Sequence, residues 1–459
     1  MLGYWAGGVD AVFLCFDRLR CWVWAVLVVT LGVCLWALGE PLVLDPPTAP
    51  GDLDADIEVW AWNIAAGSLE HLTPMFNEIY PRCRVRVNMN GTNVQSRFLL
   101  SLAAGVGAPD VMQLQVRETP RYSMTGKLTD LTEVAKKYEH DFPPSFWQDC
   151  MHDGRVYGIP WDIGPGGIFY KRSIFEACGV DPESIVTWDD YVSAGVTIMK
   201  KSGGKTKMLC LPRGMLVELF EPLLQQSGGQ IFDKEGRLAI NSKESLQVLR
   251  VMRRMLEMGI GANINFWTHE FLASLKSRAV ATYVAGAWFG GTIRDDAPTT
   301  SGDWGVIRLP EMEPGGLRTS NFGGSTLVIP DQCKNKEAAW RFIEFALCTK
   351  EAQIEQFRAF ELYPALLSTH SDPFFDEPEP FYGGQKTRRQ FSLDIDKIPT
   401  MYRTLNWVET ERYINQTFSR WVNDRMKDPE GMLAQLEEKL SRRLGCGISP
   451  GSLSLRGRD

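Results

Sequence analysis

The chain has 459 residues, which exceeds the usual size of one domain and predicts two or three domains. Apolar residues make up 44% and charged residues 23%, values of a globular protein that exclude disorder or a fibrous structure for most of the chain. The net charge of −7 argues against nucleic acid as a partner, because a phosphate backbone requires a basic protein surface.

The first predicted element is an uncharged apolar segment, residues 21–38. As a helix it would span about 27 Å, close to the hydrocarbon thickness of a bilayer. Arg18 and Arg20 precede it, and no Lys or Arg follows until Arg82, so the positive-inside rule places residues 1–20 in the cytoplasm. We therefore predict a transmembrane helix, a location at the cell membrane, and a main domain on the extracytoplasmic side.

Processing of this segment stays open. Residues 37–39 (ALG) fit a signal-peptidase site, and residues 31–34 (LGVC) partly match a lipoprotein box. The apolar run is longer than the usual signal-peptide core of roughly 7–15 residues, which favours an uncleaved anchor. Residues 39–55 contain four prolines and several acids, which predicts a stiff linker between the membrane and the exported domain.

Strand and helix patterns alternate from residue 56 onward, which predicts an α/β fold with a parallel sheet and covering helices. A capping box at residues 187–190 marks the start of one further helix. The Gly- and Ser-rich residues 446–459 predict a flexible tail. The early strands are expected at 57–61, 84–89 and 110–114, and helices at 69–80, 94–102, 335–348 and 432–440.

The catalytic and metal motifs that we tested are incomplete. His269-Glu270 begins like a zinc-protease helix but lacks the second His. Residues 203–206 (GGKT) resemble a phosphate loop, but a helix precedes them where a strand is required. The ten cysteines are scattered without a C-x-x-C pair. We therefore predict no catalytic residues, no metal site and no cofactor.

Four clusters of Gly, aromatic and polar residues fall at the ends of predicted strands. In open α/β sheets ligands bind beyond the carboxyl ends of strands. Flat aromatic faces beside hydrogen-bonding groups suit a sugar, although each Trp alone could equally fill the core. The clusters are residues 60–63 (WAWN), 157–164 (YGIPWDIG), 287–291 (AWFGG) and 321–325 (NFGGS).

Several stretches in a fixed order resemble the family-1 extracellular solute-binding proteins of ABC sugar importers, the class of the maltose-binding protein. Among them are LAAGVGAPDVMQLQ, DGRVYGIPWDIGPGGIFYKRSIFEACGVDPESIVTWDDYV and NFGGSTLVIPDQCKNKEAAWRFIEFAL. They extend over about residues 56–445. The stretch ELYPALLSTHSDPFFDEPEPFYGGQKTRRQF resembles the branch that binds arabino-oligosaccharides and lactose.

The resemblance implies an α/β, two-lobed periplasmic-binding-protein fold of type II with discontinuous lobes. One lobe would contain residues 56–161 and 311–362, and the other residues 162–310 and 363–445. Ligand-binding residues carry over from the family by matching motifs. They are Trp62, Asn63, Gln113, Trp161, Asp162, Trp288, Gly324, Ser325 and Tyr363.

The expected function follows from this resemblance. The protein would be a monomeric, extracytoplasmic carbohydrate-binding receptor that captures a sugar or oligosaccharide between its lobes. It would deliver the ligand to the permease subunits of an ABC transporter without chemistry of its own. Two alternatives remain open at this point, a membrane-tethered sugar sensor and a carbohydrate-active enzyme.

Overall fold

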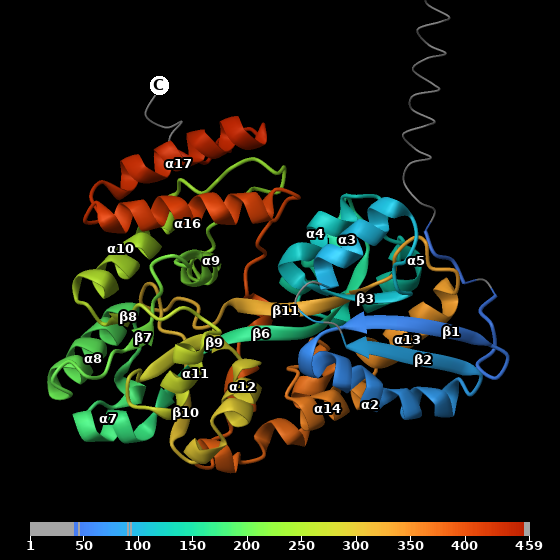
Figure 1. Ribbon diagram of the computed structural model, residues 1–459, viewed down its shortest axis with the longest axis horizontal. Helices are drawn as coiled ribbons and strands as arrows, with labels where there is room; N and C mark the ends of the chain where they lie inside the picture. Colours follow the sequence, from blue (N-terminus) through green and yellow to red (C-terminus); the bar gives the residue numbers. More distant parts are fainter. Residues whose placement is uncertain (1–40, 45, 90, 92–93, 454–459) are drawn as a thin grey trace, which may run out of the picture.

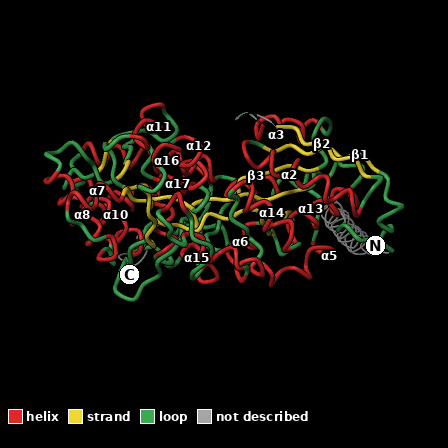
Figure 2. Tube along the Cα trace, turned by 90° about the horizontal axis from the view of Figure 1, so that it is seen from below, coloured by secondary structure: helices red, strands yellow, loops and turns green. Residues whose placement is uncertain are grey.

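A computed structural model of the chain describes residues 41–44, 46–89, 91 and 94–453, in two lobes that lie side by side along the long axis (Figure 1). Seen from below, strands run through the middle of both lobes with helices on either side (Figure 2). Among the residues described, no helix is long and apolar enough to cross a membrane. The predicted membrane segment, residues 21–38, lies outside them.

Lobe I begins with the three parallel strands that the sequence predicts. Strand β1 (Ala55–Ala61) lies between β2 (Cys83–Met89) and β3 (Val111–Gln115). Side chains of a strand alternate between the two faces of its sheet. Val59 therefore joins the main core below the sheet, and Trp60 joins a smaller core above it.

Helices cover both faces of the lobe I sheet (Figure 1). Their positions follow the apolar periodicity of the sequence, and the predicted early helices are confirmed. The lobe I helices are α2 (Asn63–Ile79), α3 (Val94–Ala104), α4 (Thr119–Ser123), α5 (Thr132–Ala135), α6 (Pro144–Asp149), α13 (Lys336–Cys348) and α14 (Lys350–Phe360).

Two strands connect the lobes. The 14-residue β6 (Gly158–Lys171) pairs with β11 (Asn321–Val328) in its first half. Its second half pairs with β9 (Thr282–Gly286) and β10 (Trp304–Arg308) in lobe II. Strand β11 continues to β3 in lobe I, so that one sheet passes through the junction.

Much of lobe II packs around a separate apolar core, whereas other lobe II residues, among them Phe271 and Phe289, belong to the core cluster that also contains the lobe I sheet. The predicted capping box is present, since Thr187 and Asp190 bind each other's backbone N–H groups. The lobe II helices are α7 (Arg172–Cys178), α8 (Trp188–Lys201), α9 (Val217–Gln226), α10 (Lys243–Glu257), α11 (His269–Lys276), α12 (Phe289–Asp296), α15 (Thr387–Phe391), α16 (Trp407–Asn423) and α17 (Pro429–Leu444).

Two segments lie close to the predicted lobe boundaries, which stay predictions. The N–H of Glu311 donates to the carbonyl of Val186 in lobe II over 2.7 Å, and β11 then pairs with β3 of lobe I. Residues 363–398 form the first part of the predicted lobe II segment 363–445. Phe374 packs on Phe357 of lobe I, and Phe391 packs on Phe169 in the lobe II half of β6, so this part of the segment contacts both lobes.

Both terminal segments are attached to the lobes. The N–H of Leu42 donates to the carbonyl of Asp130 over 2.8 Å, and Thr48 Oγ1 donates to Glu337 over 2.7 Å. Residues 41–44 and 46–53, part of the predicted spacer, therefore lie along lobe I. At the other end, the N–H of Ser449 donates to the carbonyl of Leu238 over 2.7 Å, so residues 446–453 are not a free tail.

A buried arginine joins the two lobes beside the shared strands. The guanidinium of Arg403 lies 2.8 Å from Asp149 of α6 and 2.7 Å from Glu221 of α9. All three side chains are nearly inaccessible, with Arg403 only 5% exposed. Burial raises the pKa of Asp149 to about 7, while the charge of Arg403 acts in the opposite direction. The arginine thus neutralises carboxylates from both lobes.

We predict that Arg403→Met destabilises the protein by about 3–5 kcal/mol, because removal of one partner leaves buried carboxylates unpaired. The midpoint of a urea melt at pH 8 measures this loss. Arg420→Met is the matched control: Arg420 is exposed on α16, and its replacement should change the free energy of unfolding by no more than about 0.5 kcal/mol. Equal midpoints for the two variants would contradict the prediction.

Candidate ligand-binding site

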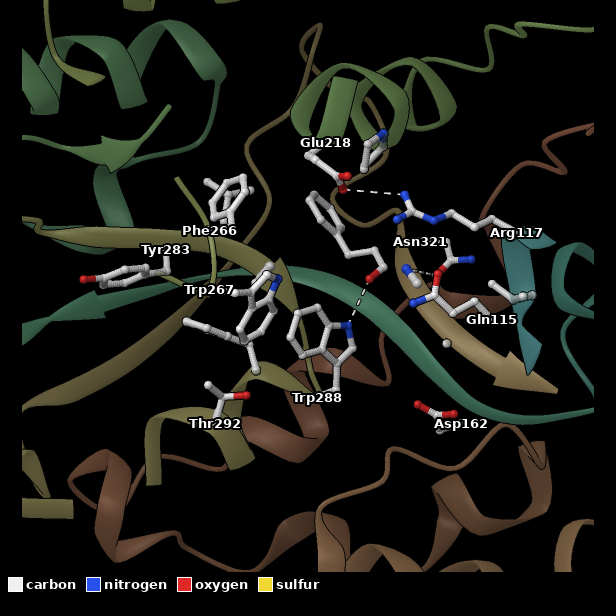
Figure 3. A pocket seen from close by; sticks show the side chains of 18 of the residues that line it. Gln115, Arg117, Asp162, Glu218, Phe266, Trp267, Tyr283, Trp288, Thr292 and Asn321 are labelled. Atoms are coloured by element: carbon white, nitrogen blue, oxygen red, sulfur yellow. Dashed lines mark hydrogen bonds and ion pairs between the residues drawn. The ribbon is translucent and has the colours of Figure 1, made fainter. Parts of the chain in front are cut away.

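A cavity of about 550 Å³ lies at the junction of the two lobes (Figure 3). Its volume falls within the usual range for small-molecule sites, roughly 300–1,000 Å³. Lobe I contributes the end of β1 and the turn after β3, and lobe II contributes the start of α9 and the turn between β9 and α12. The crossovers of β6 and β11 form the floor between them.

The lobe II wall of the cavity is aromatic. Trp288 is half-buried, and its indole Nε1 donates to the carbonyl of Phe322 over 2.9 Å. This hydrogen bond ties the ring to β11. Gly286 makes the position possible, because a Cβ there would lie 2.6 Å from the indole nitrogen. Trp267 lies beside Trp288, with the ring centroids 5.9 Å apart and the planes inclined by 31° (Figure 3).

The lobe I wall is polar and held by buried hydrogen bonds. The buried amide of Gln113 accepts from the N–H of Trp62 over 3.0 Å and donates to Ser325 Oγ over 2.9 Å. It therefore fixes the residues after β1 against those of β11. These groups line the same cavity as Trp288 with hydroxyl and amide atoms.

Asp162 supplies a buried carboxylate at the floor of the cavity. Its Oδ1 has no hydrogen-bond partner among the described residues. Burial raises the pKa of this carboxyl, and hydrogen bonds from Ser325 act in the opposite direction. A buried polar atom without a partner is uncommon in native proteins, and at the wall of a cavity this oxygen is free to accept a hydrogen bond from a ligand.

Charged residues of both lobes meet near the rim. Arg117, after β3, lies 3.5 Å from Glu218 of α9, and both side chains are partly exposed (Figure 3). The charges of Arg117 and Glu218 also act on the carboxyl group of Glu411, which lies on α16. Burial raises its pKa to about 7, the charge of Arg117 lowers it, and Glu218 raises it further.

The family described as bacterial extracellular solute-binding protein matches residues 60–353. The chain belongs to this family. The predicted family is thereby confirmed, and the solved structures described below confirm the two-lobed α/β fold.

Relatives and solved structures extend over most of this solute-binding protein. The arabinooligosaccharide-binding protein of Halalkalibacterium halodurans is 25% identical over 72% of this chain and 76% of its own. The lactose-binding protein of Rhizobium radiobacter is 24% identical over 75% of this chain and 83% of its own.

Among solved structures, a Bifidobacterium animalis subsp. lactis binding protein in complex with β-1,6-galactobiose superposes with a TM-score of 0.71. It is 23% identical and covers 86% of this chain and 99% of its own. The sugar-binding protein MalE of Xanthomonas citri reaches a TM-score of 0.73 at 20% identity, covering 85% of this chain and 97% of its own. These structures share the fold of the present protein.

The structure brings six of the nine predicted ligand-binding residues to the cavity. Their roles in ligand binding stay predictions. Asn63 is the first residue of α2, and its side chain lies outside the described part of the protein. The six that line the cavity are Trp62, Gln113, Asp162, Trp288, Gly324 and Ser325.

Trp161 and Tyr363 lie away from the cavity. Trp161 is 0% exposed, and its indole N–H donates to Gln356 of α14 over 2.6 Å. It neighbours Asp162 on a strand, so its side chain points to the opposite face of the sheet. Tyr363 is 1% exposed, and its hydroxyl donates to the carbonyl of Arg388. Both residues fill the core in this structure.

The cavity also contains residues that sequence reasoning missed. Trp267 lies in the loop before α11, and Arg117 and Glu218 approach each other from different lobes. The sequence offered one local signal, Thr268, which caps α11 and thereby places Trp267 at a loop end. No sequence signal pairs Arg117 with Glu218, because this contact depends on how the lobes are placed.

We predict that the stability of this solute-binding protein depends on the proton at Glu411. The pKa of Glu411 in the folded protein is about 7, above its ordinary value of 4.5, so folding favours the protonated carboxyl. The stabilisation that the proton provides is therefore complete below pH 4.5 and is lost as the pH rises through 7. Glu411→Gln should therefore raise the urea midpoint relative to the unmodified protein more at pH 8 than at pH 5.5.

Glu409, an exposed residue that precedes Glu411 on the same helix, provides the control. Glu409→Gln should shift the midpoint equally at both pH values. A Glu411→Gln gain that does not change with pH would show that the carboxyl titrates normally.

Proposed function

We propose that this protein is an extracytoplasmic receptor that binds a sugar or oligosaccharide between its lobes and delivers it to an ABC-transporter permease. The observation that carries the proposal is the half-buried indole of Trp288 in one cavity that also contains the buried, partly unpaired carboxylate of Asp162. The relatives named as arabinooligosaccharide- and lactose-binding proteins support the same ligand class.

The chemistry of the cavity fits a sugar. One face of a pyranose or furanose ring carries C–H groups, which lose water favourably against an indole. The hydroxyl groups at the ring edge can donate to Asp162 and exchange hydrogen bonds with Ser325 and Gln113. A hydrogen bond to a charged acceptor contributes about 1.5–3 kcal/mol, and a mismatched ligand would leave Asp162 unsatisfied. The site thereby combines affinity from the ring face with selectivity from the hydroxyl pattern.

Ligand capture would proceed by lobe closure, with bending confined to the crossovers. Hinges are a few residues that absorb changes in backbone dihedrals. Gly323 and Gly324 have φ values of 107° and 137° and interrupt the regular register between β11 and β6. Side chains strongly disfavour such backbone conformations, so glycine is suited to a bend at this point.

We propose that residues 21–38 anchor the protein in the cytoplasmic membrane with both lobes outside it. The attachment of Leu42 to lobe I leaves only a few residues between the apolar segment and the folded body. At up to about 3.6 Å per residue, this distance holds lobe I near the bilayer surface. Such a tether would keep a monomeric receptor beside its permease partner.

Protease added to spheroplasts tests the topology. Both lobes should be degraded while a cytoplasmic marker stays intact, because the positive residues flank the apolar segment only on its N-terminal side. Complete protection in intact spheroplasts, with degradation after lysis, would place the lobes in the cytoplasm and contradict the proposed location.

We predict that Trp288→Ala weakens sugar binding at least about tenfold, since truncation of an aromatic anchor often costs ~2 kcal/mol and 1.4 kcal/mol is one decade. A thermal-shift screen of arabino-oligosaccharides, lactose and β-1,6-galactobiose first identifies a ligand, and calorimetric titration then gives the dissociation constants. The fold should persist, because the indole is only half-buried.

Trp161→Ala provides the matched contrast. This variant removes a fully buried indole and should lose about 3–5 kcal/mol of stability in a urea melt through the cavity that it creates. If Trp288→Ala binds sugar normally and instead shows the stability loss expected for Trp161→Ala, Trp288 is a core residue and the proposed platform is wrong.

A further inference from the structure

Trp267 is exposed where tryptophan is usually buried. Its side chain is 58% exposed, whereas the largest fully buried side chains of the described protein include six tryptophans. An indole in water forgoes the stabilisation that burial of its apolar surface would give. Trp267 nevertheless lines the cavity between the lobes, where a ligand could cover it.

The backbone of Trp267 is strained and held in place by its neighbours. Its φ is +64°, in the left-handed region that bulky residues rarely adopt. The next residue, Thr268, donates from its hydroxyl to the carbonyl of Asn265 over 2.8 Å and accepts from the N–H of Phe271. This helix cap fixes the loop. Strained residues of this kind cluster at binding sites, where the surrounding structure holds them in position.

The two cavity tryptophans are direct neighbours, with their ring centroids 5.9 Å apart. Trp267 and Trp288 lie side by side with their planes inclined by only 31° (Figure 3). Trp288 is tied to the shared strands at the floor of the cavity, and the more exposed Trp267 lies farther toward solvent. Phe271 packs against Trp267, with ring centroids 5.7 Å apart, and supports it from lobe II.

We infer that Trp267 forms a second sugar-ring subsite next to Trp288, so that the ligand is an oligosaccharide of at least two rings. The inference rests on the proposed function and specifies its ligand. One ring covers Trp288 and reaches Asp162, while the next ring covers Trp267 and continues toward solvent. A monosaccharide contacts only the inner subsite, so Trp267 selects for chain length.

Trp267→Gly tests this inference, because it removes the indole and also relieves the left-handed backbone. Loss of binding in this variant therefore reports the missing ring face and not a damaged fold, which a urea melt verifies. Calorimetric titrations use arabinose and arabinotriose, galactose and β-1,6-galactobiose, and lactose. Trp288→Ala serves as the reference variant for the inner subsite.

For the oligosaccharide that the unmodified protein binds, Trp267→Gly should raise the dissociation constant at least about tenfold. The dissociation constant of the corresponding monosaccharide should change less than twofold, whereas Trp288→Ala should weaken both ligands. If the unmodified protein binds the oligosaccharide but not the monosaccharide, the tenfold loss for the oligosaccharide alone supports the inference.

Three other outcomes overturn the inference while the proposed function stands. The first is unchanged oligosaccharide affinity in Trp267→Gly, and the second is an equal loss for monosaccharide and oligosaccharide. The third is an unmodified protein that binds the monosaccharide as tightly as the oligosaccharide. An unmodified protein that binds none of these sugars, nor any other glycan, overturns the proposed function itself and the subsite with it.

Discussion

The pairing of β6 with β11 holds the two lobes and the cavity in one arrangement. Strand β6 is buried along its whole length and pairs with lobe I at one end and lobe II at the other. Buried backbone groups must keep their hydrogen bonds, so this ladder restricts where the chain can bend. The irregular register around Gly324 is the place where the ladder is interrupted. Asp162, Ser325 and the carbonyl that holds Trp288 all belong to this crossover.

Periodicity in the sequence was sufficient for the first strands and helices of lobe I, whereas the family resemblance came from matching sequence stretches. Strands β1 to β3 and their helices lie where the apolar pattern places them, because each has one face toward a core. Strand β6 offered no such pattern. It is buried on both faces, so its sequence does not alternate between apolar and polar residues. The sequence could therefore not show that Asp162 points into the cavity while Trp161 points into the core.

The composition of the two terminal segments correctly predicted loops, but it did not predict that these loops are hydrogen-bonded to the lobes. The proline-rich residues 46–50 and residues 446–453 are not strands or helices over most of their length. Their side chains are mostly polar or small, a composition that is typical of segments in contact with water. Backbone N–H groups of both segments nevertheless pair with lobe residues, since Thr48 donates to the carboxylate of Glu337 and Ser449 donates to the carbonyl of Leu238. Backbone hydrogen bonds do not depend on side-chain type, so composition alone cannot reveal them.

Charge balance at the junction explains why a neutral ligand suits this cavity. Arg403 is already shared by two buried carboxylates, and Arg117 faces Glu218 at the rim. Asp162 keeps one oxygen without a partner, and acidic residues of α12 also line the cavity. An anionic ligand would lose its hydration here and meet further negative charge, a cost that a hydroxyl group avoids. A polyhydroxylated, uncharged ligand can donate to Asp162 and leave the two inter-lobe arginines with their carboxylates, so that lobe closure and ligand binding do not compete for the same charges.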